Sequence, residues 1–309
     1  MKKRILITGA SGVLGTALQY YLSSQGKNVV LFCPSSNELN LLDADKTREY
    51  LMNVKPDEIY HLASIVYGLQ GNLDNQWKAI HLNTKINDNF FNVCIDIKPK
   101  KIFYASTVAA YPDGASNPLR EAELFEGLPH WGEYGYAFAK RHAYGYLEIL
   151  KHEFGIPYVY GIFTNIYGPN DRFNIKTGHV IPSLLYKAFL AAEKGGDKFE
   201  IWGNPRTTRD FIYSMDAAEA AVLAMERTTG SINIASGVES SIGQVVNIIT
   251  DMFPGIVPQW INQDLVGINK RSVDISLLKE IGWQPKVNLK EGLWLTKDWM
   301  CKFKENLRI

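Results

Sequence analysis

The 309-residue sequence has the composition of a folded globular protein, with 46% hydrophobic and 21% charged residues. Its 33 Lys and Arg against 32 Asp and Glu give a net charge of +1, which excludes a general electrostatic attraction to nucleic acid. The three cysteines, Cys33, Cys94 and Cys301, lie far apart and form no C-x-x-C pair. We therefore expect no disulfide framework, no bound metal and a reducing, cytoplasmic environment. The apolar runs are too short for a signal peptide or a membrane span, so we expect a soluble protein without membrane contact.

In the first half of the chain, short apolar runs alternate with helical segments. The predicted strands are 4–8, 28–32, 58–63, 101–106 and 157–163, and the predicted helices are 12–25, 44–54, 77–96 and 133–154. This alternation predicts an α/β fold with a doubly wound parallel (Rossmann) sheet covered on both faces.

After residues 167–169 the pattern changes to a Gly- and Asn-rich loop, short strands and helices near 181–194, 216–227 and 242–253. We expect a Rossmann domain over 1–166, to which some later segments return. Residues 167–309 should form mainly a smaller lobe at the carboxyl ends of the strands.

Three glycines lie between the first predicted strand and the first helix. Gly9, Gly12 and Gly15 follow each other at three-residue spacing in the stretch TGASGVLG. A dinucleotide pyrophosphate needs a tight turn, a close backbone approach and exposed helix-start amides at this place. The spacing departs by one residue from G-x-G-x-x-G, and an ordinary strand–helix turn is the alternative. Its position in a βαβ unit favours a dinucleotide site.

The second strand should end beside the adenosine ribose, where an acid selects NAD and an Arg selects NADP. The residues there are Cys-Pro-Ser-Ser-Asn at 33–37, which contain neither. Ser11, Ser35 and Ser36 could hydrogen-bond a 2′-phosphate or a 2′-hydroxyl, so the residues leave NAD and NADP open.

Tyr136 and Lys140 stand four residues apart on a predicted helix, so the phenol and the ammonium share one helix face. A fixed positive charge lowers the pKa of a nearby phenol, which would suit Tyr136 to acid–base catalysis. Tyr134 lacks such a partner, because the residue four positions later is Phe138. Chance pairs of this kind occur in a sequence with 16 tyrosines.

The hydroxyls of Ser106 and Thr107 end the fourth strand, where ligand chemistry collects in an open α/β sheet. A hydroxyl there could hydrogen-bond the substrate oxygen that the tyrosine protonates. The glycine turn, this hydroxyl and the Tyr/Lys pair together indicate a reductase-type site.

With these features the sequence resembles the extended short-chain dehydrogenase/reductases, that is, the NAD-dependent epimerase/dehydratase family acting on nucleotide sugars. The resemblance covers essentially the whole chain and is greatest toward the GDP-L-fucose synthases, which are GDP-4-keto-6-deoxy-mannose epimerase/reductases. It is carried further by residues 38–43 (ELNLLD), 164–169 (TNIYGP), 178–182 (GHVIP) and 202–211 (WGNPRTTRDF).

The resemblance implies roles for individual residues. It selects Thr107 over Ser106 as the hydroxyl and assigns catalysis to Thr107, Tyr136, Lys140 and His179. The implied cofactor contacts are Gly9, Ser11, Gly12, Val13, Leu14, Gly15, Ser35, Ser36, Asp43, Leu62, Ala63, Asn83, Tyr136 and Lys140. The implied substrate contacts are Thr107, Asn165, His179, Val180, Trp202 and Arg209, with the Arg paired to the sugar diphosphate.

The sequence departs from the resembled pattern at the second proton-transfer group. A two-carbon epimerisation uses a Cys and a His, and the Cys position is Ala109 whereas His179 is present. Val108 and Ala109 also stand where the dehydratases carry an Asp-Glu pair. In addition, Ser11 and Ser36 replace arginines that bind phosphate.

The sequence thus predicts an NAD- or NADP-dependent oxidoreductase that reduces the C4 ketone of a nucleotide-linked 4-keto sugar, GDP-linked by resemblance, without epimerisation at C3 and C5. A 4-epimerase or dehydrogenase with retained NAD is the alternative enzyme, and a cofactor-sensing binding protein of the same fold is the alternative outside enzymes. The helices near 77–96 and 133–154 carry surplus apolar surface, and relatives pair them in a dimer, so we expect a homodimer.

Overall fold

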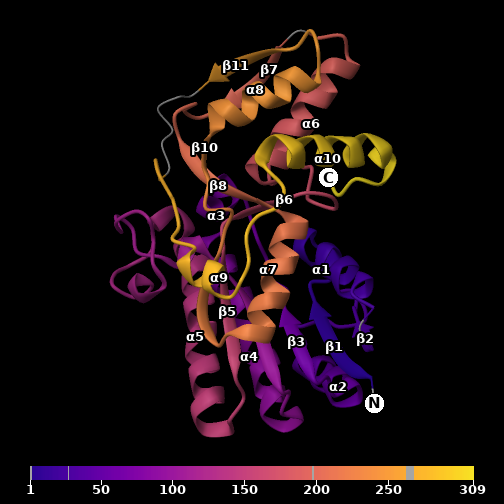
Figure 1. Cartoon of the computed structure of the whole chain (residues 1–309), viewed down its shortest axis with the longest axis vertical. Coiled ribbons are helices and arrows are strands. Elements are labelled where there is room, and N and C mark those ends of the chain that lie inside the picture. Colours follow the sequence, from indigo (N-terminus) through magenta and orange to yellow (C-terminus); the bar gives the residue numbers. More distant parts are fainter. Residues whose placement is uncertain (1, 27, 197, 262–267) are drawn as a thin grey trace.

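The computed structural model describes residues 2–26, 28–196, 198–261 and 268–309. Its larger lobe is built around a sheet of six parallel strands in the order β2-β1-β3-β4-β5-β9 (Figure 1). The strands are β1 (Lys3–Thr8), β2 (Val29–Phe32), β3 (Glu58–His61), β4 (Lys101–Thr107), β5 (Tyr158–Phe163) and β9 (Gly230–Ile234). β2 lies on one side of β1, whereas β3 and the later strands lie on its other side. The carboxyl ends of β1 and β3 therefore flank a switch point, and ligands bind at such points in open α/β sheets.

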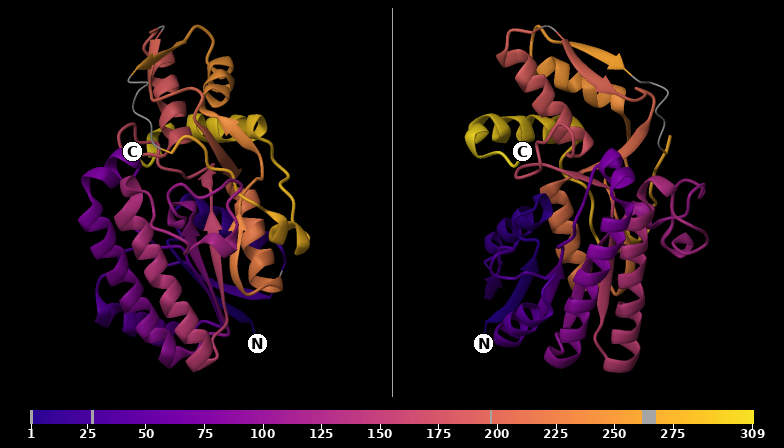
Figure 2. Two further views of the ribbon diagram at one scale, coloured as in Figure 1. Left: turned by 90° about the vertical axis from the view of Figure 1, so that its left-hand side faces the viewer. Right: turned by 180° about the vertical axis from the view of Figure 1, so that it is seen from behind.

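Helices cover both faces of this sheet. One face carries α1 (Val13–Ser24) packed beside α7 (Ser214–Arg227). The other carries α2 (Ala44–Val54), α4 (Gln76–Ile97) and α5 (Tyr134–Phe154), which pack side by side (Figure 2). The predicted doubly wound parallel sheet is confirmed.

The smaller lobe has its own hydrophobic core, formed by buried side chains between Tyr167 and Met300. Its helices are α6 (Val180–Glu193), α8 (Ile242–Met252) and α10 (Leu289–Lys302), and its strands are β6 (Asn165–Tyr167), β7 (Lys198–Trp202), β8 (Thr208–Tyr213), β10 (Glu239–Ser241) and β11 (Val257–Ile261). β10, β8 and β6 form one small sheet, and β11 pairs with β7 in another. This lobe sits beyond the carboxyl ends of the main strands (Figure 1).

Local signals explain where several helices begin and end. Asp43 caps α2 by accepting a hydrogen bond from the Lys46 amide, and Ser241 caps α8 in the same way from Gln244. Gly155, with a φ of 68°, ends α5 in the left-handed conformation that glycine adopts readily.

Short elements escaped sequence reasoning. These are α3 (Leu69–Asp74), α9 (Ser276–Glu280) and the single 3₁₀ turns η1 (Val108–Ala110), η2 (Glu121–Glu123), η3 (Trp131–Glu133) and η4 (Lys304–Asn306). The third strand ends two residues earlier than predicted, because the chain leaves the sheet at Leu62.

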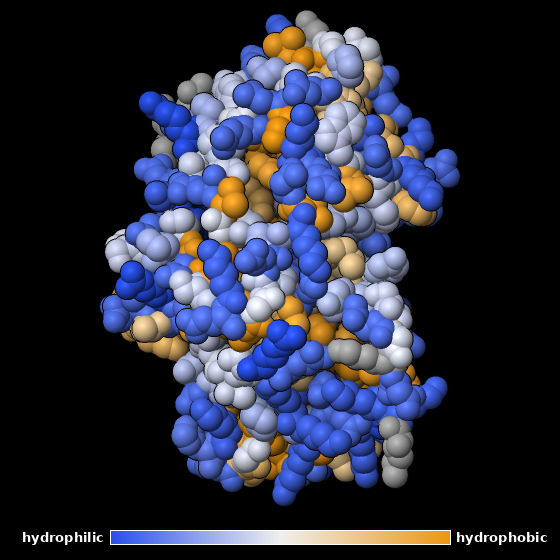
Figure 3. Space-filling view, viewed as in Figure 1, coloured by the Kyte–Doolittle hydropathy of each residue, from blue (hydrophilic) through white to orange (hydrophobic). Residues whose placement is uncertain are grey.

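No helix within the described ranges has both the length and the apolar composition needed to cross a bilayer. On the face shown in Figure 3, hydrophilic side chains predominate and hydrophobic ones occur in small groups between them.

Candidate active site

A cavity of about 690 Å³ opens at the carboxyl ends of β1, β3, β4 and β5. Its floor comes from the larger lobe, through the glycine turn, residues 62–68 and residues 105–108. Its other wall comes from residues 163–166, 171–172 and 177–180 with Arg209 and Arg271. The cavity therefore joins the dinucleotide-binding end of the sheet to the smaller lobe.

The glycine turn forms a cradle that larger residues would fill. Gly9 has a φ of 68°, and a Cβ atom there would lie 2.8 Å from the Ala63 amide nitrogen. A Cβ on Gly12 would lie 3.3 Å from the Gly9 carbonyl oxygen. No side chain caps the start of α1 at Gly12, so the amides of its first turn remain available to an anionic ligand. These features fit the pyrophosphate of a dinucleotide, with Val13 and Leu14 in the cavity lining.

Tyr136 and Lys140 both line the cavity from α5. The Nζ atom of Lys140 lies 5.5 Å from the centre of the Tyr136 ring and donates a hydrogen bond of 2.7 Å to the carbonyl oxygen of Ala105. The lysine side chain is thus anchored to the end of β4, beside the phenol, and its residue is only 2% exposed.

Burial changes the proton affinity of both groups. It raises the pKa of Tyr136, and the charge of Glu133 adds to this rise while the Ser64 hydroxyl opposes it. Burial lowers the pKa of Lys140 to about 7. The sequence predicts that Lys140 lowers the pKa of the phenol, but burial is the largest influence on that pKa and raises it.

Several buried polar atoms at this cavity have no hydrogen-bond partner. Among the described residues, Asn72 Oδ1, Asp171 Oδ2 and Thr177 Oγ1 are buried and unpaired, and all three residues line the cavity. Thr107 also lines it, and its hydroxyl accepts a hydrogen bond from the Ala109 amide. Unpaired buried donors and acceptors are costly, so they indicate a polar, hydroxyl-rich ligand.

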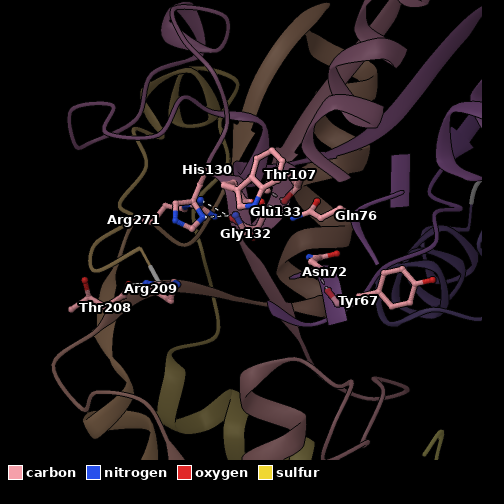
Figure 4. Close-up of polar contacts among 12 residues, drawn as sticks. Tyr67, Asn72, Gln76, Thr107, His130, Gly132, Glu133, Thr208, Arg209 and Arg271 are labelled. Atoms are coloured by element: carbon pink, nitrogen blue, oxygen red, sulfur yellow. Dashed lines mark hydrogen bonds and ion pairs between the residues drawn. The ribbon is translucent and has the colours of Figure 1, made fainter. Parts of the chain in front are cut away.

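Two arginines approach each other across the substrate end of the cavity. Arg271 Nη2 lies 2.9 Å from Glu133 Oε2, and Arg209 Nη1 donates to the Thr208 carbonyl (Figure 4). Burial and the charge of Arg271 lower the pKa of Arg209 to about 10. Arg209 and Arg271 carry two positive charges and Glu133 one negative charge, which leaves a net positive charge that an anionic diphosphate can neutralise.

Sequence reasoning missed Arg271, Glu133 and His130, all of which line the cavity. The sequence predicts Glu133 only as the start of a helix. No local motif surrounds Arg271, and its partner lies 138 positions away, so only the folded chain brings the two together.

His179 lines the cavity at the start of α6, close enough to Asp171 to lower the pKa of that carboxyl. Burial has the opposite and larger effect, so the pKa of Asp171 is raised to about 6. Ala109, in the position of the missing thiol, is buried at 1% exposure and offers no exchangeable side-chain proton.

Most predicted site residues line this one cavity, but five do not. Gly9, Ser11, Gly12, Val13, Leu14, Gly15, Leu62, Ala63, Thr107, Tyr136, Lys140, Asn165, His179, Val180 and Arg209 line it. Ser35, Ser36, Asp43, Asn83 and Trp202 lie outside the lining.

Four of these outer residues have other contacts, among them Asp43, which caps α2. Asn83 is buried and bonds both the Ser64 hydroxyl and the Ile65 amide at 2.8 Å, which holds the loop after β3 in place. Ser35 donates its hydroxyl hydrogen to Glu38, and Trp202 is 60% exposed with the Lys187 ammonium over its ring.

The fold and the cavity define a Rossmann-type α/β protein with a dinucleotide cradle and a second, polar and cationic ligand site. The pattern of the NAD dependent epimerase/dehydratase family matches residues 5–235. The chain belongs to this family, as the sequence predicted.

The proteins similar to this chain in sequence or structure include GDP-L-fucose synthases and a GDP-sugar C4 reductase. A GDP-L-fucose synthase of Dictyostelium discoideum is 32% identical over 255 residues, covering 81% of this chain and 79% of that protein. The NADP-bound GDP-L-fucose synthetase of Naegleria fowleri superposes with a TM-score of 0.91 at 27% identity, covering 99% of this chain and 95% of that one. The NADP-bound GDP-mannoheptose C4 reductase MlghC of Campylobacter jejuni gives a TM-score of 0.86 at 26% identity, covering 97% and 98%.

Proposed function

We propose that this protein is an NAD(P)H-dependent oxidoreductase that reduces the C4 ketone of a nucleotide-linked 4-keto sugar. The observation that carries the proposal is the common cavity of the glycine turn, Thr107, Tyr136 and Lys140, with Arg209 and Arg271 at its far end. The names of the relatives, GDP-L-fucose synthases and a GDP-mannoheptose C4 reductase, support this class of reaction and favour guanine as the base.

NAD(P)H, when bound on the glycine turn, supplies the hydride to the C4 carbon. The Tyr136 phenol gives its proton to the C4 oxygen and recovers one from solvent after turnover. The Lys140 ammonium stabilises the transient phenolate and binds the nicotinamide ribose, and the Thr107 hydroxyl orients the ketone. These groups act chiefly by fixed geometry and charge, and Arg209 and Arg271 bind the sugar diphosphate.

The names of the relatives favour the reductase over a 4-epimerase with retained NAD, because they include a GDP-mannoheptose C4 reductase. Both reactions would use the same three groups, and release of oxidised cofactor after turnover distinguishes the reductase. A cofactor-sensing binding protein has no need of the complete Thr, Tyr and Lys set.

Epimerisation at C3 and C5 is not part of the proposed reaction. It requires a second acid–base group opposite the first, and Ala109 has none to offer. We assign His179 to orienting the substrate rather than to removing its protons.

The two lobes divide the work in this proposal. Residues 1–166, with the returning α7 and β9, bind the cofactor, and residues 167–309 mainly bind the nucleotide sugar.

We also propose a homodimer through α4 and α5, whose outer surface exposes Trp77 at 75% and Ile149 at 51%, to be checked by light scattering. A cytoplasmic location remains a prediction.

The test is oxidation of NADPH and NADH by the purified protein with a panel of freshly prepared GDP-, UDP- and dTDP-linked 4-keto sugars. We expect stoichiometric cofactor oxidation with at least one GDP-linked substrate and release of oxidised cofactor. Interconversion of two 4-hydroxy sugars by protein that retains tightly bound NAD, without net oxidation of added cofactor, would instead establish the epimerase.

A further inference from the structure

The glycine turn is approached by a residue far away in the chain. Arg308 lies in the segment that follows α10, and its Nη1 atom donates a hydrogen bond of 2.9 Å to the carbonyl oxygen of Ser11. The same atom lies 3.3 Å from the carbonyl oxygen of Asn170, so the guanidinium bridges the turn of one lobe and a loop of the other. Arg308 also lines the cavity in which the turn lies.

Three backbone and packing contacts hold Arg308 in this position. The Phe173 amide donates a hydrogen bond of 2.8 Å to the Arg308 carbonyl oxygen, and Arg172 pairs with Arg308 in a short parallel bridge. The preceding Leu307 packs against the core of the smaller lobe. The guanidinium is therefore presented from a fixed backbone although its residue is exposed.

Arg308 forms no ion pair with the residues that the structure describes, although its charge acts on the nearby Asp171 carboxyl. Within the described ranges, no carboxylate lies within ion-pair distance of the guanidinium, and its Nη2 and Nε atoms have no hydrogen-bond partner. Asp171 is near enough for the charge of Arg308 to lower its pKa, but the other Asp171 oxygen, Oδ1, accepts from the Arg172 amide. Free planar donors beside a helix start match a phosphate group.

The glycine turn lacks a cation of its own. Residues 9–15 contain no Lys or Arg, and Ser11 and Ser36 occupy the positions where the family resemblance places arginines. A dinucleotide phosphate held only by backbone amides would keep most of its charge uncompensated. Arg308 supplies a cation at this turn, because its guanidinium donates a hydrogen bond to the Ser11 carbonyl oxygen.

We propose that Arg308 binds a phosphate group of NAD(P)H at the glycine turn, so that the smaller lobe completes the cofactor site of the larger one. The ligand chemistry is a dinucleotide phosphate, either the pyrophosphate or the 2′-phosphate of NADPH. The inference rests on the proposed use of NAD(P)H and adds a residue that no local motif indicates.

The test measures binding of NADPH and NADH to the sugar-free protein by isothermal calorimetry. The proteins are wild type, Arg308→Gln, Arg308→Lys and the control Lys302→Gln, which removes a positive charge from the end of α10 outside the cavity. A charge-assisted hydrogen bond to phosphate corresponds to roughly tenfold in affinity, so Arg308→Gln should bind about tenfold more weakly. Arg308→Lys should retain much of the affinity, and Lys302→Gln should bind like wild type.

Salt separates a phosphate contact from a purely structural one, because an ion pair is screened and loop packing is not. The affinity of Arg308→Gln for NADPH should fall less steeply with added NaCl than that of wild type. Equal losses for NADPH and NADH assign Arg308 to the pyrophosphate, and a loss for NADPH alone assigns it to the 2′-phosphate.

Wild-type affinity of Arg308→Gln for both cofactors would overturn the inference, as would a loss with an unchanged salt dependence. Failure of the wild-type protein to bind either cofactor would instead overturn the proposed function. Thermal unfolding of each unliganded variant checks that the fold is retained.

Discussion

The side-chain oxygen of Gln76 accepts a hydrogen bond of 2.7 Å from the backbone amide of Gly135, one residue before Tyr136. The side-chain nitrogen of Gln76 donates to the Trp131 carbonyl, so the start of α4 holds both the turn η3 and the start of α5. A Cβ atom on Gly135 would collide with the backbone of Gln76. The position of the Tyr136 phenol therefore depends on the close contact between Gly135 in α5 and Gln76 in α4.

This relationship predicts opposite effects for two glycines of α5. Gly135→Ala should displace the start of the helix and lower both kcat and the melting temperature, because its Cβ has no room. Gly145→Ala, with nothing within 4 Å of the added atom, should stabilise the protein by roughly 0.5–1 kcal/mol at unchanged kcat. Steady-state kinetics and thermal unfolding measure both. A Gly135→Ala enzyme with wild-type kcat and stability would contradict the proposed dependence.

Removal of the phenol hydroxyl should abolish most of the chemistry and leave the cofactor site intact. Tyr136→Phe should lose about 10²–10⁴-fold in kcat, the usual contribution of general acid catalysis, with little change in NADPH affinity. Tyr134→Phe is the matched control, since Tyr134 lies on the same helix against Phe138, outside the cavity lining. Single-turnover reduction measured by absorbance at 340 nm separates the two variants. Equal rates in both would remove Tyr136 from the mechanism.

The buried lysine should reduce stability in a pH-dependent way. The pKa of Lys140 is about 7 in the folded protein and 10.5 in its ordinary environment, so between these values the unfolded chain binds a proton that the folded one does not. Stability should therefore rise with pH from about 7 toward 10 on account of this group.

Lys140→Met removes the destabilising effect of the buried lysine and should also abolish the activity. The variant should melt at a higher temperature than wild type at pH 7, and the difference should shrink at pH 9.5. The comparison of the two proteins at each pH cancels the effect of other titrating groups. A difference independent of pH would show that the lysine is charged in the folded protein throughout.

Substitution of Arg209 or Arg271 should weaken binding of the sugar nucleotide and leave binding of the cofactor unchanged. Arg271→Gln removes one diphosphate partner and leaves the Glu133 carboxylate uncompensated, so KM for the nucleotide sugar should rise by roughly tenfold or more. The dissociation constant for NADPH should stay unchanged. Arg206→Gln, an exposed cation on the same lobe outside the cavity, is the control. A weakened affinity for NADPH with an unchanged KM for the nucleotide sugar would instead assign Arg271 to the cofactor end of the cavity.

The missing thiol at Ala109 should be visible in the hydrogens of the product. Epimerisation beside a ketone passes through an enolate and exchanges carbon-bound hydrogen with solvent, whereas hydride delivery to C4 does not. Product formed in deuterium oxide should therefore carry no deuterium at C3 or C5 by NMR. Deuterium at both carbons would require another base, and the His179 and Asp171 pair would be the first to test by substitution.

The features that the sequence alone determined are local. The alternation of strands and helices, the three glycines of the turn and the four-residue step from Tyr136 to Lys140 depend on neighbours within one or two turns of chain, so periodicity and spacing predict them. The predicted α2 boundaries match the structure because a capping Asp43 marks one end and a left-handed Lys55 before Pro56 the other. The family resemblance added Asn165, His179 and Arg209, which local chemistry alone would leave as turn or surface residues.

The features that only the tertiary structure decided are contacts between distant segments. Arg271 meets Glu133 across 138 positions, and Arg308 meets Ser11 across 297. The sequence predicts that Ser35 and Ser36 contact the cofactor, which stays a prediction, and the fold places both outside the lining of this cavity. The pKa of Tyr136 was expected to fall through its lysine neighbour, yet it rises because burial depends on everything packed around the ring. Charge and burial at a site are sums over the whole fold, and no stretch of sequence contains them.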